Sequence, residues 1–368
     1  MLFLLGAGAA LATLRYLPAL DDARILRGEI ESIGSRVQQA GIGIDRPQLD
    51  SIRQDVAAAR DRLGRLTGLL ADDPLVALAR VLPPTSADVR GADAIVTAAG
   101  DIFDATEAGL IAAGRYVEIK ASQAADPENA SALALVVELM ATTRQSIASA
   151  SASLTRAETT LAAVGNDLAA PIENARQAMV TRIATYGPLL KAYVKVAADL
   201  PGILGWQEPR RYLVLTQNPA ELRPTGGFIG SYGLVSFDKG KITERTFQDV
   251  YLLDNPVDYP YVEPPPALAQ HILRPGLTWS LRDANWSPDF PTSAQDALRL
   301  YVNKSEDTTV DGVVGVTTNT IDELLRITGP ITVPDYDVTL AAGETTLKVL
   351  ELTRASDDPD ENRKAETD

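Results

Sequence analysis

The stretch Arg211–Phe237, RYLVLTQNPAELRPTGGFIGSYGLVSF, decides the predicted fold of the second half of the chain. Its two ends, 212–215 and 228–237, are apolar runs whose β-branched, aromatic and glycine content is typical of strands. The loop between them carries Arg223 and the pair Gly226-Gly227. Glycines let backbone N–H groups approach a ligand, and arginine is a rigid two-pronged donor for carboxylate or phosphate. The stretch therefore predicts two strands joined by a loop that is suited to binding an anion.

Length and charge narrow the classes of protein. The chain has 368 residues, which is longer than one hydrophobic core usually grows, so two domains are expected. A hydrophobic content of 45% and a charged content of 23% are those of a folded protein. The formal net charge of −15 argues against a nucleic-acid partner, because phosphates would be repelled.

Cysteine is absent and His271 is the single histidine, which excludes whole groups of chemistry. Without cysteine there are no disulfides, no thiol catalysis and no cysteine-ligated metals. With one histidine, Ser-His-Asp catalysis and multi-histidine metal sites are not expected. We interpret His271 as a surface or loop residue and not as a base, so a metal here would be a hard cation held by carboxylates.

The apolar N-terminal run Met1–Leu14 is shorter than the roughly 20 residues that span a bilayer. It fits three interpretations: the core of a signal peptide, a buried core helix, or the outer part of a membrane-spanning helix. A signal peptide would need a basic leader and a small-residue cleavage site, and neither is evident. We therefore expect a partial membrane-spanning helix over residues 1–16, which places the rest of the chain outside the cytoplasm.

Residues 17–204 repeat a helical pattern. Apolar residues alternate in steps of three and four, as in the seam of a coiled coil, first over 49–70 and again over 133–168. Helix-breaking residues interrupt the pattern at Gly41–Pro47, at Asp72-Asp73-Pro74 with Pro83-Pro84, and at Ala125–Asn129. We expect four or five helices in an elongated antiparallel bundle. The bundle is either a stalk that lifts the second domain off a membrane or a scaffold without a ligand.

Residues 205–356 predict an α/β domain, since glycine, proline and aromatic residues become more frequent and the apolar period shifts towards two. Asp238–Gly240 is a hairpin turn before a strand at 241–248, and a long irregular segment, 251–278, is typical of a binding loop. A helix capped by Thr292 follows and ends near Asn303. The remaining predicted elements are a buried strand at 312–316, a helix at 321–327, a strand at 331–333 and a helix at 345–352.

The order strand, helix, strand over 312–333 predicts a right-handed crossover between parallel strands, and therefore a mixed sheet. The polar end, 357–368, is expected to be solvated or truncated. The predicted fold class is thus a helical bundle followed by an α/β domain.

Two loops carry the candidate chemistry, and we expect them to meet at one cleft beside the sheet. The first holds Glu221, Arg223 and Thr225; the second holds Arg282, Asp283 and further polar residues between Trp279, Trp286 and Phe290. The arginines suit a phosphate or pyrophosphate, and carboxylates suit Mg²⁺ beside it. The carboxylates considered for Mg²⁺ are Asp249, Asp254, Asp283 and Asp289. Phosphoryl transfer needs mainly positioning and charge neutralisation, so histidine and cysteine are dispensable.

A purely structural interpretation stands beside the functional one. Arg223 with Glu221, and Arg282 with Asp283 or Asp289, are equally consistent with ion pairs that hold the loops. The two tryptophans would then only fill the core.

Three strings carry a resemblance to the bacterial domain-of-unknown-function family 4012: NPAELRPTGGFIGSYG, RDANWSPDFPTSA and VDGVVGVTTNTIDELLRITGPITV. The similar region spans roughly Arg210 to Val338, and the helical half is similar only in style. Members of that family typically carry an N-terminal membrane helix, a helical extracytoplasmic region and this domain. The resemblance implies a single-pass protein of the bacterial cell membrane, with the bulk of its chain extracytoplasmic.

The same region is similar, more weakly, to the LytR-CpsA-Psr family of extracytoplasmic phosphotransferases, which move glycans from a polyprenyl-pyrophosphate carrier to the cell wall. In that likeness Arg223 matches the first arginine and Asp249 the aspartate of an Arg-Asp pair. Gln248 replaces the second arginine, Thr225 and Gly226 stand where an acidic residue is expected, and Arg282 is a candidate substitute. Losing one guanidinium costs on the order of 1.5–3 kcal/mol per charged hydrogen bond.

Two functions are therefore predicted. The first is a membrane-anchored protein of the cell envelope that binds or transfers a polyprenyl-(pyro)phosphate-linked glycan, with Mg²⁺ as the implied cofactor. The alternative is a non-catalytic envelope scaffold with homo-oligomeric or envelope protein partners. The candidate catalytic residues are Arg223, Asp249, Arg282 and Asp283, with Asp249 and Asp283 as metal ligands. The candidate binding residues are Glu221, Thr225, Gly226, Gly227, Gln248, Asn285, Trp286 and Asp289.

Overall fold

The chain consists of two compact units, Met1–Trp206 and Gln207–Asp368. A computed structural model describes residues 2–82, 85–165, 167–255, 260–273, 276–305 and 309–355, with side chains described for all of these except 2–20, 335 and 353–355. The predicted break at Pro83-Pro84 and the predicted polar end at 357–368 lie outside these residues. Each unit is described by itself below.

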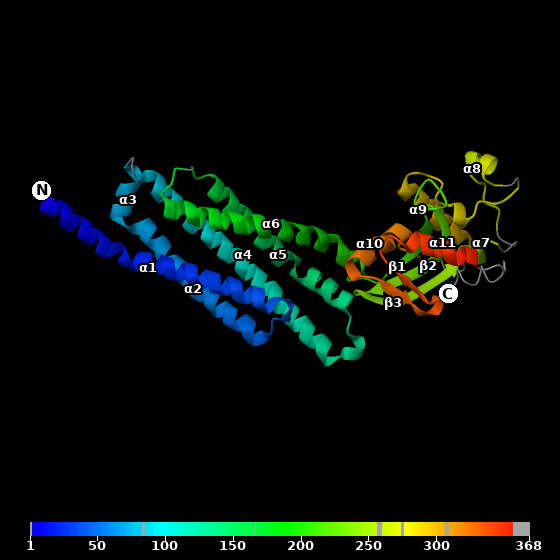
Figure 1. The fold of residues 1–368 in the computed structure, drawn as a ribbon, viewed down its shortest axis with the longest axis horizontal. Helices are drawn as coiled ribbons and strands as arrows, with labels where there is room; N and C mark the ends of the chain where they lie inside the picture. The colour runs from blue at the N-terminus through cyan, green and yellow to red at the C-terminus, as the bar shows by residue number, and fades with distance from the viewer. Residues whose placement is uncertain are drawn as a thin grey trace. The chain divides into compact units, whose positions relative to one another are not determined.

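The first unit is helical, as the sequence predicts (Figure 1). Helices α2, α4 and α5 pack successively against one another, with α1 against α2 and α6 against α5. The predicted breaks at Gly41–Pro47, Asp72-Asp73-Pro74 and Ala125–Asn129 are confirmed by the helix ends. The helices are α1 (Leu2–Ala40), α2 (Arg46–Asp72), α3 (Pro74–Val81), α4 (Ser86–Ala125), α5 (Ala132–Ala162) and α6 (Ala170–Ile203).

Local capping explains where α2 and α3 begin. Asp45 accepts the amide of Gln48, whose side chain accepts the amide of Asp45, so the first turn of α2 is closed by a capping box. Asp73 caps α3 through the amides of Leu75 and Val76. These side chains satisfy amide groups that a helix N-terminus otherwise leaves unpaired.

The predicted helix seams form part of the bundle core. The seam of α2 is buried as predicted, from Leu49 to Leu63. On α5 the prediction holds from Thr143 to Leu161. It is wrong beyond Ala162, where α5 ends, and at the start, where Val136 is exposed and Val137 is fully buried. The buried stripe there is displaced by one residue, because Val136 and Val137 are equally apolar and the spacing alone does not choose between them.

Two features concern the ends of the bundle. Pro188 and Pro201 lie inside α6, which ends at Ile203, close to Pro201. At the N-terminus, α1 runs without interruption from Leu2 to Ala40, so the backbone shows no break near residue 16. Within the described residues, no helix is both long and apolar enough to cross a membrane.

The second unit is built on a mixed sheet of four strands in the order β3-β2-β1-β4. Strand β1 pairs antiparallel with β2 and parallel with β4, while β2 pairs antiparallel with β3. Lys239 and Gly240 join β2 to β3 with positive φ angles of 49° and 77°, the backbone that a tight hairpin requires. The strands are β1 (Arg210–Asn218), β2 (Phe228–Asp238), β3 (Lys241–Asp249) and β4 (Gly312–Thr317).

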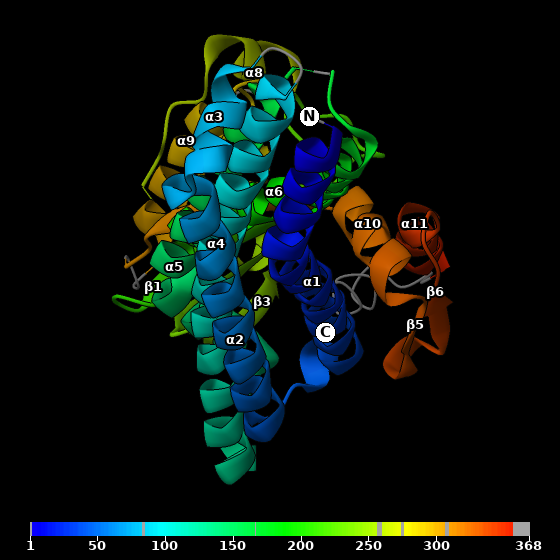
Figure 2. The ribbon, with the colours of Figure 1, turned by 90° about the vertical axis from the view of Figure 1, so that its left-hand side faces the viewer.

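The predicted crossover between 312–316 and 331–333 is wrong. Strand β5 (Ile331–Val333) leaves the main sheet and pairs antiparallel with β6 (Val338–Leu340), and α10 (Thr318–Thr328) packs on α11 (Thr345–Ala355) in the same region (Figure 2). The parallel pair of the sheet is instead β1 with β4. Because β4 is an edge strand, it is half-buried with one exposed residue rather than fully buried as predicted.

The remaining helices cover the core of this unit. Strand β1 buries Leu213 and Leu215, and α9 (Phe290–Lys304) buries Ala297 and Leu300 in the same cluster. The predicted cap of α9 at Thr292 is wrong, because Asp289 caps it by accepting both the amide and the hydroxyl of Thr292. The irregular segment after β3 contains two short helices, α7 (Val250–Asp254) and α8 (Pro266–His271).

Candidate functional site

The loop after β1 is held against the segment that precedes α9. The side-chain amide of Asn285 donates to the carbonyls of Thr225 and Gly227, the latter at 2.6 Å. In return, the Thr225 hydroxyl donates to the carbonyl of Asn285 at 3.2 Å. The Gln217 side chain donates to the Thr225 carbonyl at 3.1 Å. Thr225 and Asn285, both predicted as ligand-binding residues, therefore hold the loop that carries Arg223.

The two glycines of this loop are required by its backbone. Gly226 and Gly227 have φ angles of +72° and +107°, a region that residues with a side chain rarely adopt. A Cβ atom on Gly227 would lie 2.0 Å from the carbonyl oxygen of Asn218, and one on Gly226 would lie 2.1 Å from Oε1 of Gln217. These glycines thus close the loop tightly.

We expect Gly227→Ala to lower the free energy of unfolding of the second unit by at least about 2 kcal/mol, because a strained φ angle and a backbone collision coincide. Urea unfolding of the full chain measures the change. The matched control is Gly230→Ala in β2, where an added Cβ meets no atom within 4 Å. Equal effects of the two substitutions would contradict the role given to Gly227.

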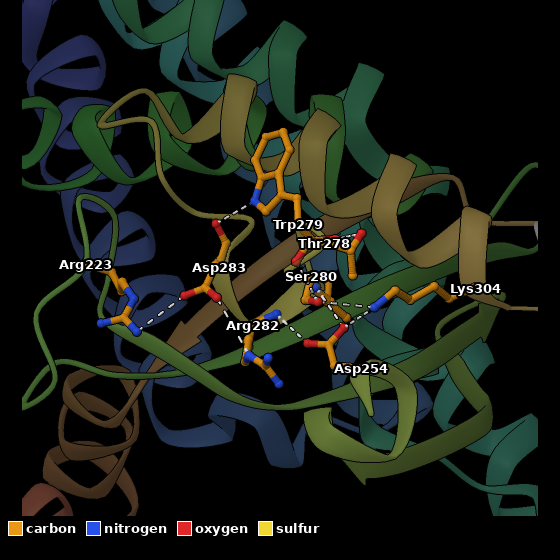
Figure 3. A network of polar contacts seen from close by, with 9 residues as sticks. Arg223, Asp254, Thr278, Trp279, Ser280, Arg282, Asp283 and Lys304 are labelled. Carbon is orange, nitrogen blue, oxygen red and sulfur yellow. Dashed lines mark hydrogen bonds and ion pairs between the residues drawn. The ribbon is translucent and has the colours of Figure 1, made fainter. Parts of the chain in front are cut away.

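The two predicted arginines meet at one carboxylate (Figure 3). Nη2 of Arg223 lies 3.4 Å from Oδ1 of Asp283, and Nε of Arg282 lies 3.7 Å from Oδ2. The Asp283 side chain is 5% exposed, whereas those of Arg223 and Arg282 are 21% and 22% exposed. The carboxylate thus lies below two guanidinium groups that reach solvent. The predicted ion pair of Arg282 with Asp283 forms. Arg223 pairs with Asp283 instead of with Glu221.

Each guanidinium group of the pair also stacks on an aromatic ring. Arg223 lies 5.2 Å from the ring centroid of Phe228, and Arg282 lies 5.0 Å from that of Tyr251. The two rings are themselves neighbours, with centroids 6.4 Å apart. A stacked arginine loses little further freedom when it binds an anion, because its planar group is already oriented. Nε of Arg223 is buried without a hydrogen-bond partner.

The electrostatics of the site favour a further negative charge. Burial raises the pKa of the Asp283 carboxyl above its ordinary value, while Arg223 and Arg282 oppose that shift. Two guanidinium groups face one carboxylate, so the cluster keeps at least one positive charge in excess. A low-dielectric setting strengthens the attraction of that excess charge for an oxyanion.

Asp249 does not join this cluster. It ends β3, is 2% exposed, and caps α7 by accepting the amide of Tyr251. Its Oδ2 has no hydrogen-bond partner, and among the described residues no hydrogen bond or ion pair links it to Asp283 or to either arginine. The neighbouring Gln248 accepts the hydroxyl of Tyr232 at 2.6 Å instead of facing a ligand.

The described residues do not present a donor set that fits Mg²⁺. No group of three or more histidine, cysteine, aspartate and glutamate residues comes together in the part of the chain that the structure describes. The Asp283 oxygens already face two cations, which would repel a metal ion. Mg²⁺ stays a prediction from the sequence.

The other predicted binding residues are peripheral. Glu221 is exposed and accepts a long hydrogen bond of 3.4 Å from Asn218. Asp289 is used as the cap of α9. Trp286 is partly buried against the hydrophobic core, and the indole of Trp279 donates to the Asp283 carbonyl at 3.0 Å. His271 is the last residue of the short helix α8 and is exposed, so it is a surface residue but not a loop residue.

The sequence did not indicate which residues pack against and hold the arginine pair. Lys304 at the end of α9 forms a buried ion pair with Asp254, which was considered as a metal ligand. Phe228 and Tyr251 were read as strand and loop residues without a role beside the arginines. A lysine in the last turn of a helix is common, because it complements the helix dipole, so its position carried no signal of burial.

The fold and the site together define an α/β domain in which two loops of a mixed sheet bring a pair of arginines onto one buried carboxylate. Residues 207–354 match the family model described as "Protein of unknown function (DUF4012)". The match lies entirely within the α/β unit. No curated protein matches the chain. No solved structure matches it.

Proposed function

We propose that the α/β unit binds a phosphate or pyrophosphate group through Arg223 and Arg282. The observation that carries this proposal is the sharing of one buried carboxylate by two partly exposed guanidinium groups. Asp283 contacts both guanidinium groups and so fixes their separation. Their N–H donors that face solvent are available for a second oxyanion. Inorganic pyrophosphate is the simplest probe of this chemistry.

The surroundings of the pair support an amphiphilic ligand. Leu222, next to Arg223, is 88% exposed, and Leu252, next to Tyr251, is 60% exposed. Apolar side chains beside a cationic pair suit a phosphate that carries a hydrocarbon chain. We therefore propose a polyprenyl-(pyro)phosphate-linked glycan as the ligand, bound on the outer face of the bacterial membrane by a protein that the N-terminal helix anchors.

Calorimetric titration of the full chain tests the proposal. We expect saturable binding of inorganic pyrophosphate, and tighter binding of a short polyprenyl pyrophosphate at the same ionic strength. Leu222→Ser with Leu252→Ser should reduce the difference between the two ligands and leave pyrophosphate binding unchanged. The absence of pyrophosphate binding at low salt would refute the anion site, whereas equal affinities for the two ligands would refute only the lipid.

A non-catalytic scaffold is the second candidate, and one observation favours it. Each arginine already has a carboxylate and an aromatic partner, which is also how an ion pair holds two loops together. Under this function, removing Arg223 changes stability and assembly alone. Mg²⁺-dependent turnover of a polyprenyl-phosphate-linked sugar that is lost in Arg223→Ala would exclude the scaffold and extend binding to phosphotransfer.

A further inference from the structure

A buried ion pair lies beneath the arginine pair. Nζ of Lys304, on α9, lies 2.9 Å from Oδ1 of Asp254, on α7, and their side chains are 1% and 0% exposed (Figure 3). Burying two charges costs several kcal/mol per ion, and apolar residues of similar volume usually stabilise such a position equally well. Stability alone is therefore a weak explanation for this pair.

The second observation is what Asp254 holds. Its two oxygens accept the amides of Leu281 and Arg282, at 2.9 and 3.0 Å. These amides begin the 3₁₀ turn η3 (Leu281–Asp283), which contains two of the three charged residues of the site. Lys304 adds a hydrogen bond of 3.3 Å to the hydroxyl of Ser280, directly before the turn.

The far end of the turn is fixed in a similar way. The Trp279 indole donates to the carbonyl of Asp283 at 3.0 Å and is itself 4% exposed. The turn is thus held at its first amides by Asp254 and at its last carbonyl by Trp279. The backbone that presents Arg282 and Asp283 has little freedom to shift.

We propose that Asp254 and Lys304 are positioning residues for the anion site: by locking η3, they set Arg282 and Asp283 at the separation from Arg223 that an oxyanion requires. This inference rests on the proposed function. Lys304 orients the Asp254 carboxylate, and Asp254 fixes the turn by accepting two of its amides. Neither side chain touches the ligand.

The test compares two carboxylates of the same unit. Asp254→Asn keeps the shape of the side chain but removes the charge that pairs with Lys304 and one of the two acceptor oxygens. The matched control is Asp322→Asn, because Asp322 is 8% exposed and accepts the amide and the hydroxyl of Thr345. Affinity for inorganic pyrophosphate and the urea midpoint are measured for each variant. We expect at least a tenfold loss of affinity in Asp254→Asn and less than a twofold change in Asp322→Asn.

The two proposals fail differently. If affinity falls in proportion to stability, and does so equally in Asp254→Asn and Asp322→Asn, the positioning role is overturned. The anion site would remain intact. No binding of pyrophosphate to the unaltered chain would overturn the anion site itself.

Hydrogen exchange of the unaltered chain supplies a measurement that needs no variant. The amides of Leu281 and Arg282 should exchange as slowly as those of β1, because a buried carboxylate accepts both. Exchange at the rate of exposed loop amides would show that the turn is not locked, and would overturn the inference even if Asp254→Asn does not fold.

Discussion

Arg223→Ala is expected to weaken binding of inorganic pyrophosphate by about 10- to 150-fold, the equivalent of about 1.5–3 kcal/mol for a charged hydrogen bond. The affinity of Arg223→Lys should lie between those of the unaltered chain and Arg223→Ala, since lysine keeps the charge and loses the two-pronged geometry. Arg282→Ala should resemble Arg223→Ala. The effects of the two alanine substitutions should not add in the double variant, because both side chains contact Asp283.

Arg245→Ala is the control for this series, since it removes the same charge from an exposed position of β3. Calorimetry at constant ionic strength gives the affinities, and thermal unfolding shows whether each variant is folded. An equal loss of affinity in Arg245→Ala and Arg223→Ala would mean that pyrophosphate responds to net charge alone, and the paired-arginine site would then be abandoned.

Lys304→Met is expected to have the largest effect on stability, a loss of about 3–5 kcal/mol, because it leaves the carboxylate of Asp254 buried without a cation. A domain is typically stable by about 5–15 kcal/mol, so the variant should unfold at much lower urea concentrations. Circular dichroism of the full chain follows this transition.

The control for Lys304→Met is Lys348→Met on α11. Lys348 pairs with Glu351 at 2.8 Å, but both side chains are exposed, so the expected change is below about 0.5 kcal/mol. Changing both members of the buried pair, Asp254→Asn with Lys304→Met, should recover part of the lost stability, because no charge remains buried. If Lys304→Met proves as mild as Lys348→Met, the stabilising role given to the buried pair is wrong.

Local signals were enough for most of the architecture. The strand pattern of Arg211–Phe237 and the helix breaks of the bundle depend on neighbouring residues only, and the structure confirms them. The cap of α9 was misplaced because Asp289 and Thr292 are both good capping residues. Proline at the second helical position, Pro291, is compatible with the Asp289 cap that forms.

Long-range pairing could not be predicted in the same way. A strand, a helix and a strand in sequence usually share one sheet, but β5 is only three residues long and finds β6 within a few residues. The meeting of Arg223 with Asp283 followed from the expectation that two loops share one edge of the sheet. The buried ion pair of Asp254 with Lys304 did not follow from the sequence, because only the fold brings α9 against the start of η3.

The pairing of β1 with β4 has a consequence for how this unit acquires its structure. Tyr212 lies opposite Gly312, whereas β1, β2 and β3 are joined by short connections. The three-stranded meander can therefore form early, and closing the chain between β1 and β4 is the slow, entropically costly step. Until β4 docks, one edge of β1 offers unpaired amides and carbonyls to any other extended chain. Self-association during synthesis or refolding should consequently begin at β1, and chains that stop before residue 312 should aggregate.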